Sequence, residues 1–134
     1  MEKNKVENFL YEDLSYKIRG CAFRVYNTLG FGHKENVYQE ALASEFKKEK
    51  LNFEREKVLP VIYEGRKIGN YKPDFVVEDK IIIEIKAVPF MPPEHEKQLV
   101  YYLKSINYRL GFLINFGDKH LDIKRRIWTP RYQR

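Results

Sequence analysis

Cysteine is almost absent from this sequence, in which Cys21 stands alone. A single cysteine excludes an internal disulfide and a thiolate cluster for zinc, and its apolar neighbours on a predicted helix favour a small core residue. The three histidines are scattered over different elements without metal-ligand spacing, at His33, His95 and His120. We assign these histidines no role beyond contact with phosphate.

Long apolar runs are also lacking. No run approaches the roughly 20 residues of a membrane span, and the stretch MEKNKVENFLYEDLS lacks the apolar core and cleavage site of a secretory signal. We therefore expect a cytoplasmic protein with no membrane partner. Hydrophobic residues make up 43% of the 134 residues and aromatic residues 15%, without low-complexity segments or repeats. This composition predicts one domain, residues 1–134, with a sizeable core.

Positive charge is concentrated at the carboxyl end of the sequence. In the segment 119–134 six basic residues stand against the single acid Asp122, a net +5 out of +6 for the whole chain. A concentrated cationic end suits a polyanion such as nucleic acid, and we predict Lys124, Arg125 and Arg126 as nucleic-acid-binding residues. A solvated basic tail is an alternative of about equal weight.

Two amphipathic helices are predicted in the first third of the chain. The first is indicated by apolar residues at helical spacing that end before Gly30 and Gly32, namely Ile18, Cys21, Ala22, Val25 and Leu29. The second is predicted over residues 35–50, with a core face of Val37, Ala41, Leu42 and Phe46.

Three stretches rich in β-branched and aromatic residues follow, at 53–63, 67–77 and 81–88. Short turns separate them, which predicts an antiparallel meander. A helix is expected from near Glu94 and a buried strand over residues 109–116, and a helix between two strands of one sheet usually makes a parallel crossover. With a final element of undetermined type at 121–128, the fold class is mixed α/β or α+β, with helices flanking the sheet.

Two charged residues interrupt the isoleucine-rich stretch IIIEIK, residues 81–86. Strand side chains alternate, so Glu84 and Lys86 share one face and lie about 7 Å apart. If the preceding turn holds three residues, 78–80, then Asp74 stands opposite Glu84 on that face. A two-residue turn would move Asp74 to the other face.

Two opposed carboxylates destabilise a strand pair unless a cation lies between them. Asp74, Glu84 and the backbone carbonyl of Ile85 are hard oxygen ligands of the kind that magnesium prefers, with water and substrate phosphate completing its shell. We therefore predict a site for Mg²⁺, or for Mn²⁺ in its place, holding one or two ions. The alternative for such a short motif is a half-exposed strand whose polar residues face water.

Two motifs in the sequence resemble known families. Pro73-Asp74 followed by Glu84 and Lys86 resembles the signature of the PD-(D/E)XK nuclease superfamily. The stretch GHKENVY, residues 32–38, resembles the G-x-x-E-x-x-Y pattern of the GxxExxY protein family, a branch of that superfamily. The resemblance extends from about residue 30 to 116 and implies a nuclease-like domain with a restriction-endonuclease-like core.

The resemblance also implies roles for the charged residues of the strands. Asp74 and Glu84 match the metal-binding carboxylates of the superfamily. Lys86 matches the lysine that orients the attacking water or steadies the phosphate.

Three further residues are given roles by the resemblance, each with a simpler alternative. Glu35 matches a helical acid that reaches the metal, often through water, but could merely favour a helix amino terminus. Gln98, in EHEKQLVYYL, matches a glutamine of the helix after the core strand, but could be solvated surface. Tyr38 closes the G-x-x-E-x-x-Y pattern, and its alternative is a packing residue with a hydrogen-bonded hydroxyl.

These residues together predict a magnesium-dependent nuclease, an enzyme that hydrolyses phosphodiester bonds in DNA. A homodimer is expected, because a domain this small covers little duplex unaided. One alternative is a nucleic-acid-binding module that keeps the fold without cleaving, and another is a protein-interaction domain that regulates a neighbouring system. The presence of Asp74, Glu84 and Lys86 together favours catalysis.

Overall fold

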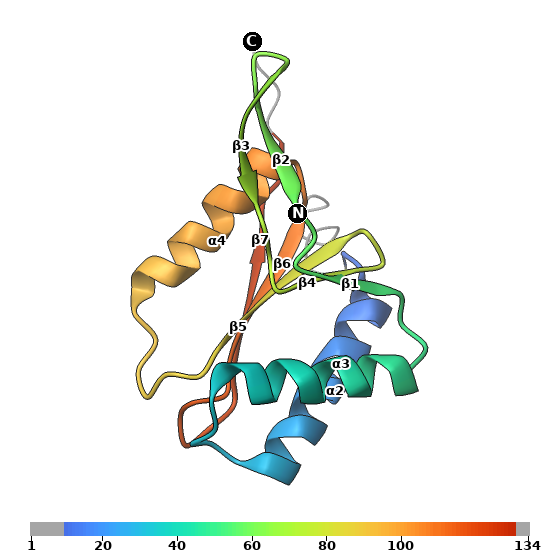
Figure 1. The fold of residues 1–134 in the computed structure, drawn as a ribbon, viewed down its shortest axis with the longest axis vertical. Helices are drawn as coiled ribbons and strands as arrows, with labels where there is room; N and C mark the ends of the chain where they lie inside the picture. Colours follow the sequence, from blue (N-terminus) through green and yellow to red (C-terminus); the bar gives the residue numbers. More distant parts are fainter. Residues whose placement is uncertain (1–9, 131–134) are drawn as a thin grey trace, which may run out of the picture.

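The computed structural model describes residues 10–130, in which helices and strands are mixed along the chain (Figure 1). The helices are α2 (Glu12–Leu29), α3 (Glu35–Lys48) and α4 (Pro93–Ile106). The strands are β1 (Phe53–Arg55), β2 (Leu59–Tyr63), β3 (Arg66–Tyr71), β4 (Phe75–Val77), β5 (Ile81–Lys86), β6 (Leu110–Asn115) and β7 (Asp122–Ile127).

Five of the strands form one mixed sheet in the order β1-β4-β5-β6-β7. The pair β5 and β6 is parallel, with α4 as the crossover between them, and the other neighbours are antiparallel. The remaining strands, β2 and β3, form a separate two-stranded hairpin. The predicted fold class, a mixed α+β sheet with a parallel crossover and flanking helices, is therefore confirmed.

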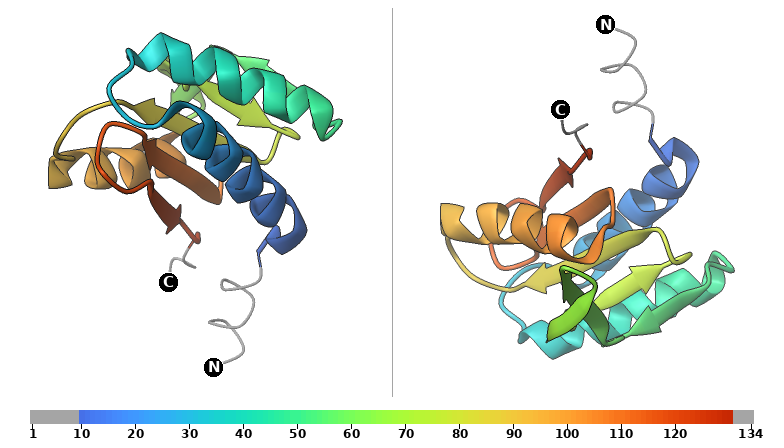
Figure 2. Two further views of the ribbon diagram at one scale, coloured as in Figure 1. Left: turned by 90° about the horizontal axis from the view of Figure 1, so that it is seen from below. Right: turned by 90° about the horizontal axis from the view of Figure 1, so that it is seen from above.

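The sheet lies between two layers of helices (Figures 1 and 2). On one face α2 and α3 cover a core that includes Cys21, Phe46, Ile83 and Phe112. On the other face α4 covers a smaller core that the hairpin joins through Leu59 and Tyr71. None of the described helices combines the length and the apolar character needed to cross a membrane.

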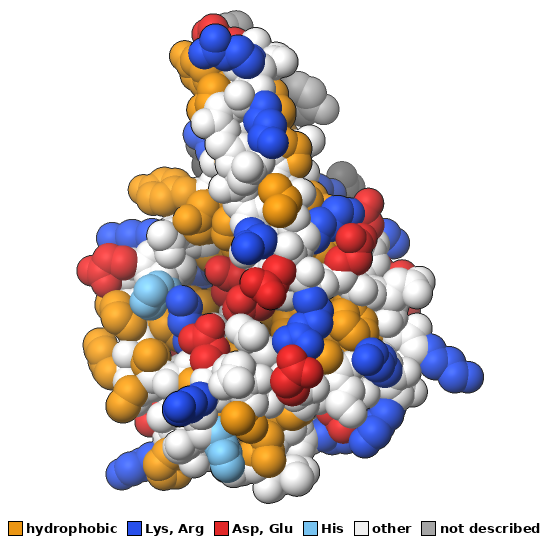
Figure 3. Space-filling model, viewed as in Figure 1, with side chains coloured by type: hydrophobic (Ala, Val, Ile, Leu, Met, Phe, Trp, Pro, Cys, Tyr) orange, Lys and Arg blue, Asp and Glu red, His pale blue; other side chains and the backbone are white. Residues whose placement is uncertain are grey.

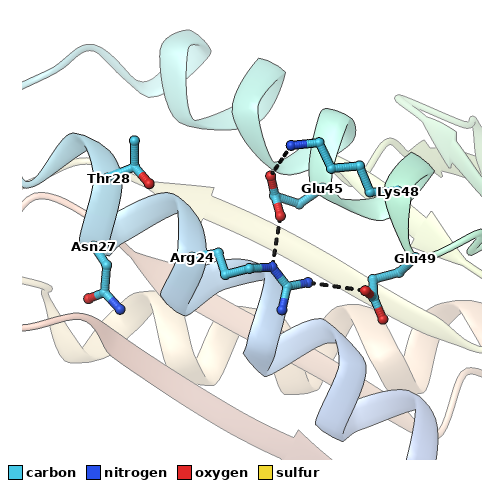
Figure 4. A pocket seen from close by; sticks show the side chains of 6 residues that line it. All are labelled: Arg24, Asn27, Thr28, Glu45, Lys48 and Glu49. Carbon is cyan, nitrogen blue, oxygen red and sulfur yellow. Dashed lines mark hydrogen bonds and ion pairs between the residues drawn. The ribbon is translucent and has the colours of Figure 1, made fainter.

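Ion pairs join the outer surfaces of α2 and α3 (Figure 4). Arg24 Nε lies 2.8 Å from Glu45 Oε1, and another nitrogen of its guanidinium lies 3.5 Å from Glu49. Lys48 Nζ lies 3.1 Å from Glu45 Oε2. A surface hollow of about 460 Å³ runs past these residues. Because the charged side chains that line this hollow form ion pairs with one another, we interpret it as a gap along the contact between α2 and α3 and not as a ligand site.

The predicted strands at 53–63 and 67–77 are each wrong as single strands, because each breaks in two. Glu56 has a positive φ of 53° between β1 and β2, and Pro73 interrupts the chain between β3 and β4. The first half of one stretch, β1, pairs with the second half of the other, β4, within the sheet. The remaining halves, β2 and β3, pair with each other as the hairpin. The meander therefore survives as β1, β4 and β5.

The predicted core face of the helix at 35–50 is displaced by about one residue. Tyr38 and Ala43 are buried together with Leu42 and Phe46, whereas Val37 and Ala41 are half-buried. The shift follows from the aromatic ring of Tyr38, which stacks on Phe116 of the loop after β6 with ring centroids 4.7 Å apart. A tyrosine that sequence patterning treats as amphipathic is here part of the core.

Candidate active site

The turn between β4 and β5 sets the position of the two acidic residues. Val77 pairs with Ile81, which leaves the three residues 78–80 in the turn. Glu78 and Asp79 adopt positive φ angles of 53° and 55° there. The three-residue alternative of the sequence analysis is therefore confirmed. Asp74, one residue before β4, is thereby brought beside Glu84.

Crossed hydrogen bonds hold these two carboxylates. The backbone N–H of Asp74 donates to Glu84 Oε1 at 2.9 Å, and the backbone N–H of Ile85 donates to Asp74 Oδ2 at 2.7 Å. Each carboxylate is thus fixed by a backbone group from the segment that carries the other. Because Ile85 lies within β5 and Asp74 directly precedes β4, both side chains are held in place before any ligand arrives.

The electrostatics of the pair are unfavourable for two negative charges. Burial and, to a smaller extent, the Asp74 carboxylate raise the pKa of Glu84 to about 7, although the Asp74 N–H, Lys86 and the Tyr71 hydroxyl lower it. Burial also raises the pKa of Asp74, against the hydrogen bond from Ile85 and the charge of Lys86. The protein therefore concentrates more negative charge here than its own cations neutralise.

Glu35 faces the same cluster from the amino terminus of α3. Burial raises the pKa of its carboxyl, with a further rise from Asp74 and an opposing effect from Lys86. The amide of Gln39, one turn later, donates to Glu35 Oε1 at 3.4 Å. The structure thus brings together Glu35, Asp74, Glu84 and Lys86, which three different segments of the chain supply.

Gln98 of α4 approaches this cluster from the other helix layer. Its side chain is exposed, and it lines a small cavity together with Glu84 and Lys86. His95, which the sequence analysis left without a specific role, lines the same cavity. Both side chains are one turn apart on α4, so this helix presents polar groups to the open side of the site.

Tyr38 lies outside the cluster and is fully buried. Its hydroxyl donates to the carbonyl of Gly30 at 2.6 Å and accepts from the N–H of His33 at 3.2 Å. These bonds close the loop that leads into α3, where Gly32 has a φ of 106°. Tyr38 is therefore a packing residue with a hydrogen-bonded hydroxyl, and its bonds fix the loop that precedes Glu35, the first residue of α3.

Tyr71, at the end of β3, is a neighbour of the site that the sequence analysis missed. It is 6% exposed and stacks on Tyr102, with ring centroids 3.8 Å apart. Its hydroxyl lies beside Glu84, whose charge adds to burial in raising the pKa of Tyr71. Within residues 10–130 no group makes a well-formed hydrogen bond to this hydroxyl. Its only sequence signal is its position three residues before Asp74.

Asn115 and Gly117 hold the chain that follows Lys86, and the sequence analysis missed them too. The buried Asn115 side chain accepts at Oδ1 from the N–H groups of Val88 and Gly117, both at 3.0 Å, and donates at Nδ2 to Val88 O at 2.9 Å. A Cβ on Gly117 would lie 2.2 Å from the backbone nitrogen of Val88. Only glycine allows this approach.

The predicted basic residues lie on a strand, β7, rather than on a solvated tail. Lys124 pairs with Asp122 at 3.3 Å, and Arg126 pairs with Glu96 of α4. Arg125 points to the opposite face, where its guanidinium donates to Leu10 O at 3.4 Å. The structure therefore does not gather the three into one surface. Of the other basic residues of this segment, Arg131 and Arg134 lie outside the described residues.

The oxygen ligands of the site suit a divalent cation that keeps part of its water shell. Within residues 10–130 no group of three or more His, Cys, Asp or Glu side chains is arranged to hold a metal ion on its own. Asp74 and Glu84 nevertheless offer two carboxylates beside the Ile85 backbone, with excess negative charge. Magnesium commonly binds through one or two carboxylates and keeps several waters. The residues present therefore fit a hard divalent cation.

Comparisons with known proteins support the predicted restriction-endonuclease-like fold. A family model described as the PD-(D/E)XK nuclease superfamily matches residues 12–126. No curated protein matches the sequence. Among solved structures, one described as "Crystal structure of SSO0001" superposes with a TM-score of 0.54 at 23% identity, covering 69% of this chain. The match spans 50% of that protein's chain, and at this identity it shows a shared fold.

Proposed function

This chain belongs to the PD-(D/E)XK nuclease superfamily, and from that premise we propose that it is a metal-dependent nuclease that hydrolyses phosphodiester bonds in DNA. The observation that carries the proposal is the crossed pair of hydrogen bonds that fixes Asp74 and Glu84 together, with Lys86 on the same strand face as Glu84. Two carboxylates that only faced solvent would be hydrated by water and would not each accept a hydrogen bond from the backbone of the other's segment.

Asp74, Glu84 and the backbone carbonyl of Ile85 are the proposed ligands of Mg²⁺, with Mn²⁺ as a substitute. Nucleases of this superfamily generally use divalent metal ions. The raised pKa of Glu84 supports the assignment, because burial and the Asp74 carboxylate both disfavour a negative charge here and a bound cation would offset both effects. When bound, such an ion supplies positive charge at the scissile phosphate and lowers the pKa of a coordinated water.

The other polar side chains of the cluster act on the phosphate and the water. Lys86 places an ammonium group beside the carboxylate pair, where it can steady the negative charge that develops on the phosphate. Glu35 faces the same space and can accept a hydrogen bond from the attacking water. Gln98, at the open side of the cavity, is proposed to contact the substrate or that water.

Within the superfamily, we assign the chain to the GxxExxY branch. Support comes from the part that each motif residue plays in the structure. Gly32 adopts a positive φ, Glu35 begins α3 and faces the carboxylate pair, and Tyr38 closes the loop from within the core. The three residues therefore act together to orient the Glu35 carboxylate toward the site.

A cleavage panel tests the proposed activity. Linear, supercoiled, single-stranded and branched DNA, together with RNA, are incubated with magnesium or manganese. We expect DNA cleavage by the wild type and its loss in Asp74→Asn and Glu84→Gln, with Glu54→Gln as a control at an exposed glutamate. Tight binding of the panel without cleavage by the wild type would favour the alternative, a nucleic-acid-binding module without catalysis. Light scattering tests the proposed homodimer.

A further inference from the structure

The β2–β3 hairpin stands out from the body of the protein. We call residues 57–72 the arm. Its inner end is anchored, because Leu59 and Tyr71 are buried against α4 and Val61 packs beside them. Its outer half projects beyond the sheet and helices (Figures 1 and 3). The tip is a two-residue turn, Glu64-Gly65, in which both residues have positive φ angles, as tight hairpins require.

The outer half of the arm exposes large apolar side chains. Ile62 is 51% exposed, Tyr63 59% and Ile68 55%. An isolated two-stranded hairpin is only marginally stable in water. Apolar side chains at its tip, which pack on nothing else in this chain, therefore contribute little to folding stability. Clustered exposed apolar residues mark interaction surfaces. The arm therefore has the composition of a contact element.

The charge of the arm selects the kind of partner. It carries four basic residues, Lys57, Arg66, Lys67 and Lys72, against one acid, Glu64, a net charge of +3. Lys57 and Lys72 lie near acidic neighbours at the base, whereas Arg66 and Lys67 lie next to the tip. Two such arms would repel each other, while a polyanion would be attracted. Charge thus favours nucleic acid over a second copy of the chain.

The position of the arm ties it to the candidate site. The arm's strand β3 ends at Tyr71, which lies beside Glu84, and Asp74 follows three residues later. A bound duplex whose scissile phosphate reaches Asp74 and Glu84 would therefore extend past the arm. The major groove of B-DNA, about 12 Å wide, admits a two-stranded β-ribbon.

We propose that the arm inserts its tip into a groove of duplex DNA, with Arg66 and Lys67 on the phosphates and Tyr63 on the groove wall. This inference rests on the proposed function, since it takes DNA as the substrate. It assigns the main duplex contact to the arm rather than to β7, whose arginines are engaged within the fold.

Fluorescence anisotropy with a labelled 20-base-pair duplex tests the proposal. Titrations are run at several salt concentrations, in EDTA to prevent cleavage and separately with calcium. The variant Arg66→Ala with Lys67→Ala is compared with a matched control, Lys17→Ala with Lys47→Ala, which removes two exposed cations from α2 and α3. Circular dichroism and thermal unfolding verify that each variant folds.

We expect the arm variant to bind at least tenfold more weakly, with the salt slope reduced by about two, while the control binds as the wild type does. Tyr63→Ala should weaken binding without altering the slope, because it removes no charge. Unchanged affinity in both arm variants would overturn the arm proposal and leave the nuclease proposal standing. Absence of binding by the wild type at low salt would overturn both. Conversion of a dimer to a monomer by the arm variant would assign the arm to self-association instead.

Discussion

Replacing Glu84 by glutamine is expected to stabilise the metal-free protein at pH 8. In the folded protein burial and the Asp74 carboxylate raise the pKa of Glu84 to about 7, from an ordinary value of 4.5. Between these two pH values the folded protein keeps a proton that the unfolded chain has lost. Stability therefore falls as the pH rises through this window, and the full cost is present above pH 7.

The size of the effect follows from the same pKa values. Raising the pKa from 4.5 to about 7 corresponds to about 3 kcal/mol, at about 1.4 kcal/mol for each tenfold change in proton affinity. Glutamine has the shape of the protonated acid and keeps an oxygen that accepts from the Asp74 N–H. It should therefore recover most of this free energy, a large share of the 5–15 kcal/mol that is typical of a domain.

Urea unfolding followed by circular dichroism in EDTA measures the difference. The free energy of unfolding of Glu84→Gln should exceed that of the wild type by about 3 kcal/mol at pH 8 and by much less at pH 5. The control Glu54→Gln, at an exposed glutamate paired with Lys57, should stay within about 1 kcal/mol at both pH values. Saturating magnesium should stabilise the wild type and not the Gln variant. A wild type equally stable at both pH values, with no gain in the variant, would refute the reasoning.

Other substitutions test the remaining parts of the site. Lys86→Met, which keeps the stem and removes the charge, should retain the fold and most DNA affinity but lose at least about 100-fold in single-turnover cleavage rate; full cleavage would contradict the role of the charge. Tyr71→Phe should raise the free energy of unfolding in urea by about 1 kcal/mol, because it removes a buried hydroxyl that lacks a well-formed hydrogen bond; a loss of stability would contradict this. Gly117→Ala should lower the thermal midpoint, because its Cβ would meet the Val88 backbone.

Much of the sheet follows from local signals in the sequence. The alternation in IIIEIK places Glu84 and Lys86 on one face, whereas the sequence left the length of the turn before this strand open, and only the structure gives the three residues that bring Asp74 beside Glu84. The helix between two apolar strands gives the parallel crossover of β5 and β6. These features depend on neighbours close in the chain, which is why sequence periodicity can predict them.

The arm and the supports of the site depend on contacts between distant segments. The alternation of residues 53–77 does not indicate which halves of the two stretches pair within the sheet. Glutamate is not a residue type that favours positive φ, so the sequence does not predict the break at Glu56. Tyr71 and Asn115 act through neighbours 13 and 27 residues away, Glu84 and Val88. Periodicity cannot assign partners at such separations, so both roles became visible only in three dimensions.

The bonds of Asn115 have a consequence for the time course of local opening. One side-chain oxygen accepts from the amides of both Val88 and Gly117, although neither residue belongs to a strand. Both amides should therefore exchange with solvent deuterium at the same slow rate, in a single event that also releases the end of the strand at Lys86. Lys86 would then keep its position for as long as the sheet stays folded, even though it is the last residue of β5.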